Sequence, residues 1–201
     1  MKFVLFHLMP YRHLDFVEAK KYRSAWTVIP NSMYDPVKGA EEYASYIEQL
    51  VTGERLGFDI IGVNEHHQTA YGLMPAPNLI ASALIQRTKT VKIGVFGRAL
   101  PLVNNPLTIA EEFAMLDNMS RGRLVVGFVR GIGAEYHSSG INPAFSHDRF
   151  HEAHDLIVKA WTQPGPFAFD GEHFPLSYAN PWPRPVQTPH PRIWIPSQGS
   201  S

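Results

Sequence analysis

Short apolar runs alternate with longer stretches of helical periodicity along this chain, and this alternation limits the possible folds more than any other feature of the sequence. A compact apolar run is typical of a buried strand, whereas apolar residues that recur every three or four positions are typical of a helix. We expect strands at 3–8, 58–63, 91–100, 124–129 and 193–195, and helices at 39–56, 78–88, from Pro106 to the turn at Ser120, and at about 147–161. Gly57 should end the first of these helices in a left-handed cap, and residues 131–143 should form a glycine-rich loop. Strands that alternate with helices form a parallel sheet through right-handed crossovers.

A parallel sheet of this kind occurs in two architectures, the doubly wound sheet and the TIM (β/α)8 barrel. A dinucleotide-binding doubly wound sheet carries the motif G-x-G-x-x-G directly after its first strand, and no such motif follows residues 3–8. Polar and charged residues gather instead after the second, fourth and fifth strands. The carboxyl ends of barrel strands are where barrel enzymes keep their active sites. The sequence therefore favours an α/β fold of the TIM-barrel type.

The chain has room for only part of such a barrel. A complete barrel typically takes about 250 residues, whereas this chain has 201 and provides five strands. Because a half-open barrel would expose strand edges and much of its core, we expect the first five βα units of a longer enzyme. Residues 1–201 would form a single partial barrel domain. The segment at about 163–191 is interpreted as an insertion, because it holds eight prolines and a hairpin that turns at Asp170-Gly171.

Composition and charge exclude several classes of function. Lys+Arg and Asp+Glu number 18 each, so the charge balance gives no reason to expect a nucleic acid or an anionic membrane as partner. The absence of cysteine removes disulfides, thiolate nucleophiles and thiolate metal sites. The apolar residues 1–10 are too few for a signal peptide, and no apolar run approaches the roughly 18 residues of a membrane helix. A cytoplasmic protein is expected.

The first candidate for chemistry is Glu65-His66-His67, where the second strand should end. Consecutive strand residues point to opposite faces, so one histidine can point over the barrel mouth while the other packs outward. A histidine at the mouth can donate or accept a proton near neutral pH. Taken alone, the dipeptide fits a pair of surface-loop histidines equally well.

Two further candidates follow the fourth and fifth strands. Arg130, in the run from Gly127 to Gly131, can bind a phosphate, although a solvated arginine in a turn is the simpler interpretation of that residue alone. The loop after the fifth strand offers hydroxyls and backbone N–H groups to a phosphate, but an ordinary loop has the same composition. Its residues are Ser197, Gln198, Gly199, Ser200 and Ser201.

Three histidines, His147, His151 and His154, share one face of the predicted helix at a spacing that can hold a metal. No His-Glu-x-x-His motif and no cysteine accompany them. Their neighbours include the charged residues Asp148 and Asp155, as on a solvated helix face. We therefore expect no metal site.

Several fragments, taken in order, resemble the luciferase-like flavin-dependent monooxygenases over roughly residues 1–201. Each fragment is modest by itself, and their order and spacing make the resemblance specific. The fragments are Leu56-Gly-Phe-Asp59 with the strand that ends in Glu65-His66-His67, Val91-Lys-Ile-Gly94 leading to Leu100-Pro101 and Asn105-Pro106, residues 110–124 running into 127–131, Arg149-Phe150, Trp161, Phe169-Asp-Gly171 and Pro191-Arg-Ile-Trp194.

The resemblance implies a TIM barrel that binds reduced FMN supplied by a separate flavin reductase. It implies a monooxygenase in which O2 adds at the flavin C4a position, and the C4a-peroxyflavin then oxidises a small organic substrate such as an aldehyde, a ketone or a hydrocarbon. Members of the family usually form dimers through their early helices, so a homodimer is expected.

The resemblance also assigns roles to residues. The first histidine of the Glu-His-His run acts near the flavin, which gives acid–base catalysis to His66 and a structural role to His67. The phosphate-binding arginine falls on Arg130, and the loop 197–201 would hold the rest of the phosphate. Phe96 and Gly97 should lie against the isoalloxazine ring. The family often has a cis peptide there, and Gly97 would tolerate unusual backbone geometry.

Two positions depart from luciferase itself and argue against light emission. Ser197 stands where luciferase has an acidic residue, and Val129 stands where it has a cysteine. Two alternatives remain open: a deazaflavin (F420)-dependent oxidoreductase on the same fold, and a non-catalytic flavin-binding relative. His7, Tyr71 and Met74 are candidates for lining a hydrophobic substrate cavity, although such residues are as often part of the core.

Overall fold

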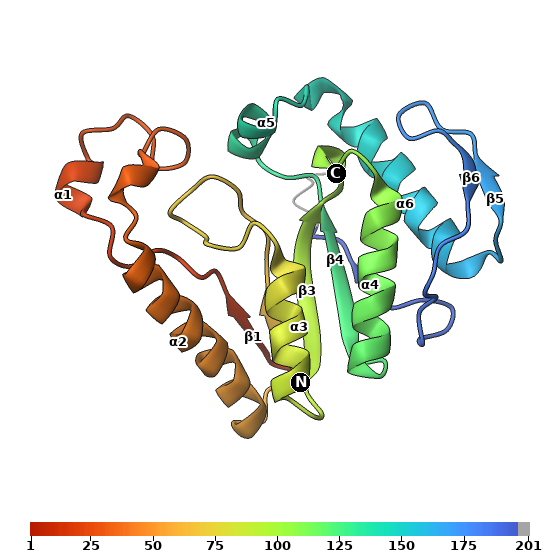
Figure 1. Ribbon diagram of the computed structural model, residues 1–201, viewed down its shortest axis with the longest axis horizontal. Coiled ribbons are helices and arrows are strands. Elements are labelled where there is room, and N and C mark those ends of the chain that lie inside the picture. The colour runs from red at the N-terminus through yellow and green to blue at the C-terminus, as the bar shows by residue number, and fades with distance from the viewer. Residues whose placement is uncertain (197–201) are drawn as a thin grey trace.

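The computed structural model describes residues 1–196, whose arrangement Figure 1 shows. Five parallel strands form one sheet, and their order in the sheet is their order along the chain. The strands are β1 (Val4–His7), β2 (Ile60–Val63), β3 (Lys92–Ala99), β4 (Leu124–Val129) and β7 (Arg192–Trp194). A doubly wound sheet reverses its strand order part-way. The unbroken order is that of a barrel, as expected from the sequence.

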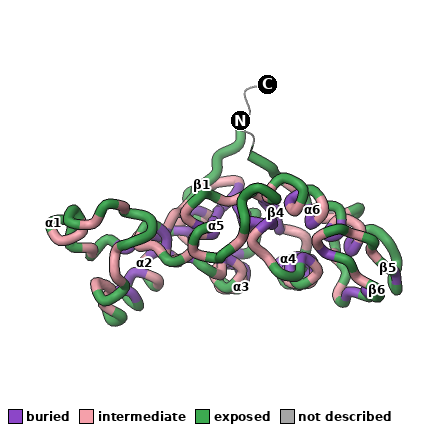
Figure 2. Tube along the Cα trace, turned by 90° about the horizontal axis from the view of Figure 1, so that it is seen from above, coloured by how far each residue is buried: buried purple, intermediate pink, exposed green. Residues whose placement is uncertain are grey.

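Helices connect the strands, and Figure 2 shows α2, α3 and α4 together on one side of the sheet. The helices are α1 (Phe16–Ala19), α2 (Pro36–Arg55), α3 (Pro77–Arg87), α4 (Pro106–Ser120), α5 (Gly133–Ser139) and α6 (Ser146–Thr162), with short 3₁₀ turns at Asn31–Met33, Leu100–Leu102 and Pro143–Phe145. The core between helices and sheet includes Leu50, Ile61, Leu84, Phe113 and Trp161. Among residues 1–196, none of the helices has both the length and the apolar character that crossing a membrane requires.

Local sequence signals fix where the helices begin and end. The helices α2, α3 and α4 each start at a proline, which has no N–H group to leave unpaired. Asp35 caps α2 by accepting hydrogen bonds from the N–H groups of Val37 and Lys38, so this helix begins at Pro36 and not at the expected residue 39. At its other end Gly57 has a φ of +82°, which confirms the predicted left-handed cap.

Two expectations about the second half of the chain need correction. The segment 131–143, expected as a glycine-rich loop, contains α5. The hairpin expected over residues 167–174 is longer than predicted, because β5 (Phe167–Phe169) pairs with β6 (Leu176–Ala179), which lies beyond the expected second strand. The reason is that the Glu152 carboxylate accepts hydrogen bonds from the backbone N–H groups of residues 172–174, which are then not free to pair with β5.

A first prediction concerns Glu54 in α2, whose carboxylate accepts hydrogen bonds from the backbone N–H groups of residues 89–91, just before β3. Burial by itself raises the pKa of Glu54, but these hydrogen bonds outweigh it and lower that pKa to about 2. We expect Glu54→Gln to lower the free energy of unfolding by about 1–2 kcal/mol in urea titrations. The matched change Glu48→Gln removes only exposed ion pairs and should cost about 0.5 kcal/mol or less.

The same carboxylate predicts a pH dependence of stability. Because the pKa of Glu54 in the folded state lies below its ordinary value of 4.5, its contribution is complete above that pH and is lost as the pH falls toward 2. The difference in unfolding free energy between the parent and Glu54→Gln should therefore shrink over this window. A difference that stays constant as the pH is lowered would contradict the assignment.

Candidate functional site

A cavity of about 1020 Å³ lies at the carboxyl ends of β2, β3, β4 and β7. Its border includes four residues singled out in the sequence: His66, Phe96, Gly97 and Arg130. They come from the ends of three neighbouring parallel strands, which meet at one edge of the sheet. The candidate phosphate loop at 197–201 lies outside the described residues.

The floor of this cavity is aromatic. The Phe96 ring stacks on Trp194, with ring centroids 4.9 Å apart and an angle of 8° between the planes. A Cβ atom on Gly94 would come within 2.3 Å of the Phe96 ring, and a Cβ on Gly62 within 2.7 Å. The Phe96 ring therefore lies over two glycines of adjacent strands, and their lack of a side chain makes room for it.

Gly97 interrupts the regular pairing of β3 with β4. The register shifts between Phe96 and Arg98, and Gly97 has a φ of +115°, a conformation that residues with a Cβ rarely adopt. A Cβ at this position would make only ordinary van der Waals contacts, 3.9 Å from side-chain atoms of Asn64 and Val129, so the backbone conformation and not a lack of space favours glycine here. The unusual geometry expected here takes the form of a bulge. The expected cis peptide is wrong: within residues 1–196, cis bonds occur only before prolines of the 163–191 segment.

The two adjacent histidines have different partners. His66 borders the cavity, and its Nδ1 lies 3.0 Å from Glu135 Oε1. His67 Nε2 lies 2.7 Å from Glu65 Oε1, and this hydrogen bond raises the pKa of His67 against the opposing effect of burial. Glu65 is also ion-paired with Arg98, 3.1 Å between Oε2 and Nη1. The histidines thus diverge as expected, and the partly exposed His67 is hydrogen-bonded to the buried Glu65, which Arg98 also contacts.

Glu135 is a site residue that the sequence analysis missed. It lies on α5, and its two carboxylate oxygens are 3.0 Å from His66 Nδ1 and 2.9 Å from the backbone nitrogen of Ile132. Glutamate at the third position of a helix is a known start signal, so the sequence contained a hint of α5. Its contact with a residue 69 positions earlier has no local signal.

Arg130 follows β4, and its exposed side chain borders the cavity. Its backbone carbonyl accepts a hydrogen bond from the Tyr136 hydroxyl, which ties the end of β4 to α5. His147 and His151 at the start of α6 border the same cavity, with rings 4.4 Å apart, and His154 is not part of that border. In the described part of the chain, no three His, Cys, Asp or Glu side chains converge as a metal ion would require.

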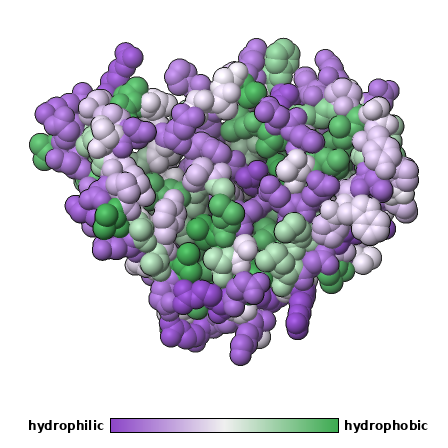
Figure 3. All heavy atoms as spheres, viewed as in Figure 1, coloured by the Kyte–Doolittle hydropathy of each residue, from purple (hydrophilic) through white to green (hydrophobic). Residues whose placement is uncertain are grey.

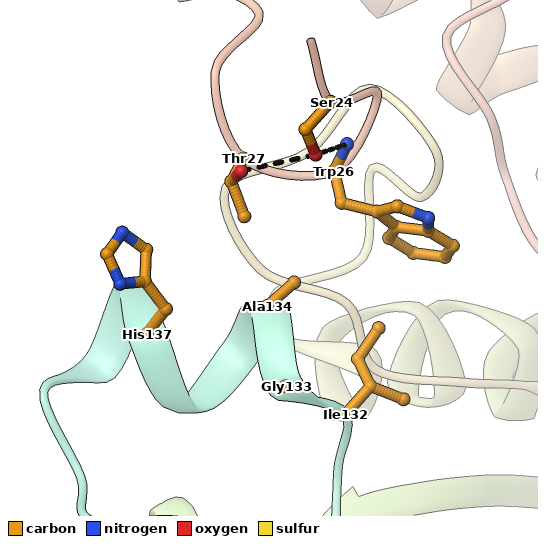
Figure 4. A pocket seen from close by; sticks show the side chains of 7 residues that line it. All are labelled: Ser24, Trp26, Thr27, Ile132, Gly133, Ala134 and His137. Carbon is orange, nitrogen blue, oxygen red and sulfur yellow. Dashed lines mark hydrogen bonds between the residues drawn. The ribbon is translucent and has the colours of Figure 1, made fainter.

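A second pocket, of about 410 Å³, adjoins the first at Ile132, which borders both. Figure 4 shows Trp26 and its neighbours in one loop facing the first turn of α5 across this pocket. Trp26 packs on Tyr71 with ring centroids 4.3 Å apart, and these two rings lie 5.9 and 5.1 Å from the ring of His66. An aromatic group therefore flanks His66 on the side of the smaller pocket.

The other two residues proposed for a substrate cavity have structural positions. Met74 is 1% exposed and belongs to the core. The His7 ring packs on Tyr46 at 4.5 Å, and its Nδ1 accepts a hydrogen bond from the backbone N–H of Met9. Burial lowers the pKa of His7. Of the three candidates, only Tyr71 lies next to the site.

Comparison with known families decides what kind of protein carries this geometry. The family model described as luciferase-like monooxygenase matches residues 23–201. The chain belongs to the luciferase-like monooxygenase family. This membership confirms the resemblance read from the sequence, and the five-stranded parallel sheet confirms the expected partial barrel.

Named members of the luciferase-like family show how much of a relative the chain covers. The oxygenase component of a flavin-dependent trigonelline monooxygenase from Acinetobacter baylyi is 31% identical over 156 residues, which are 76% of this chain and 42% of the relative. The structure of monooxygenase RslO1 from Streptomyces bottropensis gives a TM-score of 0.78 at 27% identity, covering 97% of this chain and 53% of that one. The chain thus spans about half the length of these relatives.

More distant structures share the luciferase-like fold. The oxygenating constituent of 3,6-diketocamphane monooxygenase from Pseudomonas putida, solved with FMN, has a TM-score of 0.74 at 20% identity, with 97% of this chain and 51% of that chain covered. An F420-dependent secondary alcohol dehydrogenase has a TM-score of 0.72 at 22% identity, with 96% and 51% covered. These likenesses concern the fold alone.

Proposed function

We propose that this chain forms the flavin-binding half of the oxygenase component of a two-component monooxygenase, which uses reduced FMN and O2 to oxidise a small organic substrate. One observation carries the proposal: His66, a proton-transfer group, and Arg130, a cation suited to phosphate, border the same cavity of about 1020 Å³. The trigonelline relative, named as a flavin-dependent oxygenase component, and the FMN complex of the diketocamphane enzyme support it.

The cavity offers three features that fit a flavin nucleotide. Its volume is at the upper end of the range of about 300–1,000 Å³ for ligand pockets. Asn64 Oδ1, at its border, is buried and has no hydrogen-bond partner among residues 1–196, so it can accept from an N–H group of the flavin ring. Gly97 borders the cavity without a side chain of its own, and the exposed side chain of Arg130 can reach the phosphate group.

Each group of the chain then has a task in the reaction. Reduced flavin, when bound, supplies the electrons that activate O2. Arg130 holds the phosphate and so fixes the cofactor along the cavity. The stacked pair of Phe96 and Trp194 offers an apolar surface against which the flavin ring can lie. His66 has Nδ1 engaged by Glu135, so Nε2 is the ring atom that gives or takes a proton at the reacting centre.

The partners follow from the same proposal. A separate flavin reductase supplies reduced FMN, and a small hydrophobic substrate reaches His66 past Trp26 and Tyr71. A homodimer is proposed through α3 and α4, where Figure 3 shows apolar atoms on the surface and where Leu79 and Met115 are 72% and 53% exposed.

We further propose that the chain is one partial barrel domain with an insertion at 163–191, and that the enzyme acts in the cytoplasm.

A second candidate function is an F420-dependent oxidoreductase, in which the deazaflavin carries hydride and O2 takes no part. The fold shared with the F420-dependent secondary alcohol dehydrogenase supports this candidate. A third candidate, a flavin-binding relative without turnover, differs from both in having no reaction at all. Consumption of O2 by the protein with its reduced cofactor separates the FMN monooxygenase from the other two. Reaction of a substrate with F420 in the absence of O2 separates the second candidate from the third.

The test is a titration of the protein with reduced FMN under argon, followed by a pulse of air and a measurement of O2 consumed and product formed. Saturable FMN binding with O2-dependent oxidation of an added aldehyde, ketone or hydrocarbon is the expected result. Arg130→Ala should weaken FMN binding by about 1.5–3 kcal/mol, the value of one charge-assisted contact. Arg55→Ala, far from the cavity on α2, should leave FMN affinity unchanged. Reaction with reduced F420 in the absence of O2 would overturn the FMN proposal.

A further inference from the structure

We propose that Glu135 is a positioning residue for His66: its carboxylate keeps the His66 proton on Nδ1 and so presents Nε2 to the cavity as a proton acceptor. This inference rests on the proposed function, because the role of His66 in proton transfer is part of that proposal. Glu135 lies on α5, within a segment that the sequence presents as a loop. The proposal therefore gives this helix a direct effect on the reacting histidine.

The contact between the two side chains is short and shielded. Nδ1 of His66 and Oε1 of Glu135 lie 3.0 Å apart, and the side chains are 15% and 6% exposed. An ionised carboxylate only accepts hydrogen bonds, so in this contact Nδ1 is the donor. A neutral imidazole has a single N–H group, and Nε2 is then left with its lone pair.

Glu135 is itself held in place, so the carboxylate sets the position of the histidine. Its second oxygen, Oε2, accepts a hydrogen bond from the backbone N–H of Ile132 at 2.9 Å. Gly131 has a φ of +85°, and a Cβ there would lie 3.1 Å from the same oxygen, so the glycine leaves room for the carboxylate. The carboxylate is thus fixed to the start of α5 on one side and points at His66 on the other.

The other surroundings of His66 restrict its ring to the same orientation. A Cβ on Gly72 would lie 3.0 Å from His66 Cδ2, so the loop backbone passes close to one side of the ring. Trp26 and Tyr71 both make T-shaped ring contacts with His66, at 5.9 and 5.1 Å between centroids. The backbone N–H of His66 donates to the Met74 carbonyl at 3.2 Å, which fixes the start of the side chain. Rotation away from Glu135 is therefore obstructed.

Among the described residues that border the cavity, one other carboxylate, that of Glu65, could be considered for this part. Glu65 is the adjacent residue in the chain, but its oxygens are engaged by His67 at 2.7 Å and by Arg98 at 3.1 Å. When His66 accepts a proton at Nε2, the resulting imidazolium lies against the Glu135 carboxylate, which stabilises its charge. A carboxylate in this position orients a histidine base without exchanging a proton itself.

The test reads the His66 ring directly, in the flavin-free protein. Nitrogen-15 spectra of histidine side chains identify which ring nitrogen carries the proton, and we expect the Nδ1–H form of His66 in the parent. Glu135→Ala should shift His66 toward the Nε2–H form, and Glu135→Gln, which retains an acceptor oxygen, should shift it less. Ser138→Ala removes only a hydroxyl bonded to the Glu135 backbone carbonyl and is the control for loosening of α5. Circular dichroism verifies that each variant is folded.

The turnover measurement follows on the flavin-loaded protein. Both Glu135 variants should lose about tenfold or more in turnover while the FMN dissociation constant stays within about twofold, and Ser138→Ala should match the parent. An unchanged His66 proton position in folded Glu135→Ala would overturn the inference, even if the protein is an FMN monooxygenase. A shifted proton position in a protein that shows no oxygenase activity would leave Glu135 as the positioning residue and remove the proposed function instead.

Discussion

The substitution His66→Ala is expected to lower substrate oxidation by about 10²-fold or more while the FMN dissociation constant stays near that of the parent. The reason is that, among the described histidines at the cavity wall, the ring of His66 contacts a buried carboxylate, 3.0 Å away. In the proposed function, binding energy for FMN comes instead from Arg130 and from the backbone at Gly97. Product formation from isotopically labelled O2, together with an FMN titration, measures the two effects separately.

The adjacent histidine provides the matched control for His66→Ala. His67 is bonded to Glu65 and is part of the charged network that includes Arg98, so His67→Gln should affect stability more than turnover. His66→Gln, which retains a polar side chain, should lose oxidation as His66→Ala does, because an amide does not transfer protons. Full activity in both His66 variants, or equal loss in His66→Ala and His67→Gln, would show that the assigned division of roles is wrong.

The strands and the long helices could be predicted because their signals are local. The apolar runs predicted all five strands of the sheet to within a few residues, and the prolines at 77 and 106 marked two helix starts. The start of α2 was placed at residue 39, three residues too late, because the cap at Asp35 was not recognised. The order of the strands needed a further physical rule, that crossovers are right-handed and consecutive strands pair. The position of β6 was missed because it depends on Glu152, a residue of α6 outside the hairpin. The Glu152 carboxylate accepts hydrogen bonds from backbone N–H groups of the segment that was expected to be the second strand.

The site was predictable only where a single residue has an evident chemistry. Glu65-His66-His67 and Arg130 stood out by residue type and by their place after strands. The role of Glu135 depends on a contact across 69 positions, and such pairings have no periodicity. Conversely, Arg149 belonged to the family-like fragments, but it donates to the backbone carbonyls of Pro101 and Val103 and so joins α6 to the end of β3. Residue type alone does not separate a structural arginine from one that binds a ligand.

The second large effect is expected at Asp117 in α4, a buried carboxylate that holds the 163–191 segment against the barrel. Its Oδ2 accepts hydrogen bonds from the backbone N–H groups of Val186 and Gln187 at 2.8 and 2.9 Å, and its Oδ1 accepts from Gln187 Nε2 at 2.7 Å. The side chain of Asp117 is fully buried. The Asp117→Ala change removes the acceptor for three donors in a place that water does not reach, which should lower the free energy of unfolding by about 3 kcal/mol or more.

Urea unfolding measures this loss, and Asp155→Ala, an exposed aspartate on α6, is the control, with an expected change within about 0.5 kcal/mol. The consequence extends to the cavity, because β7 begins five residues after Gln187 and carries Trp194, half of the aromatic floor. Loss of the Asp117 contacts should therefore weaken FMN binding as well, through an altered Phe96–Trp194 pair, and Trp194 fluorescence should change with it. If Asp117→Ala unfolds at the same urea concentration as Asp155→Ala, the segment is held by other contacts and the link between Asp117 and the cavity does not exist.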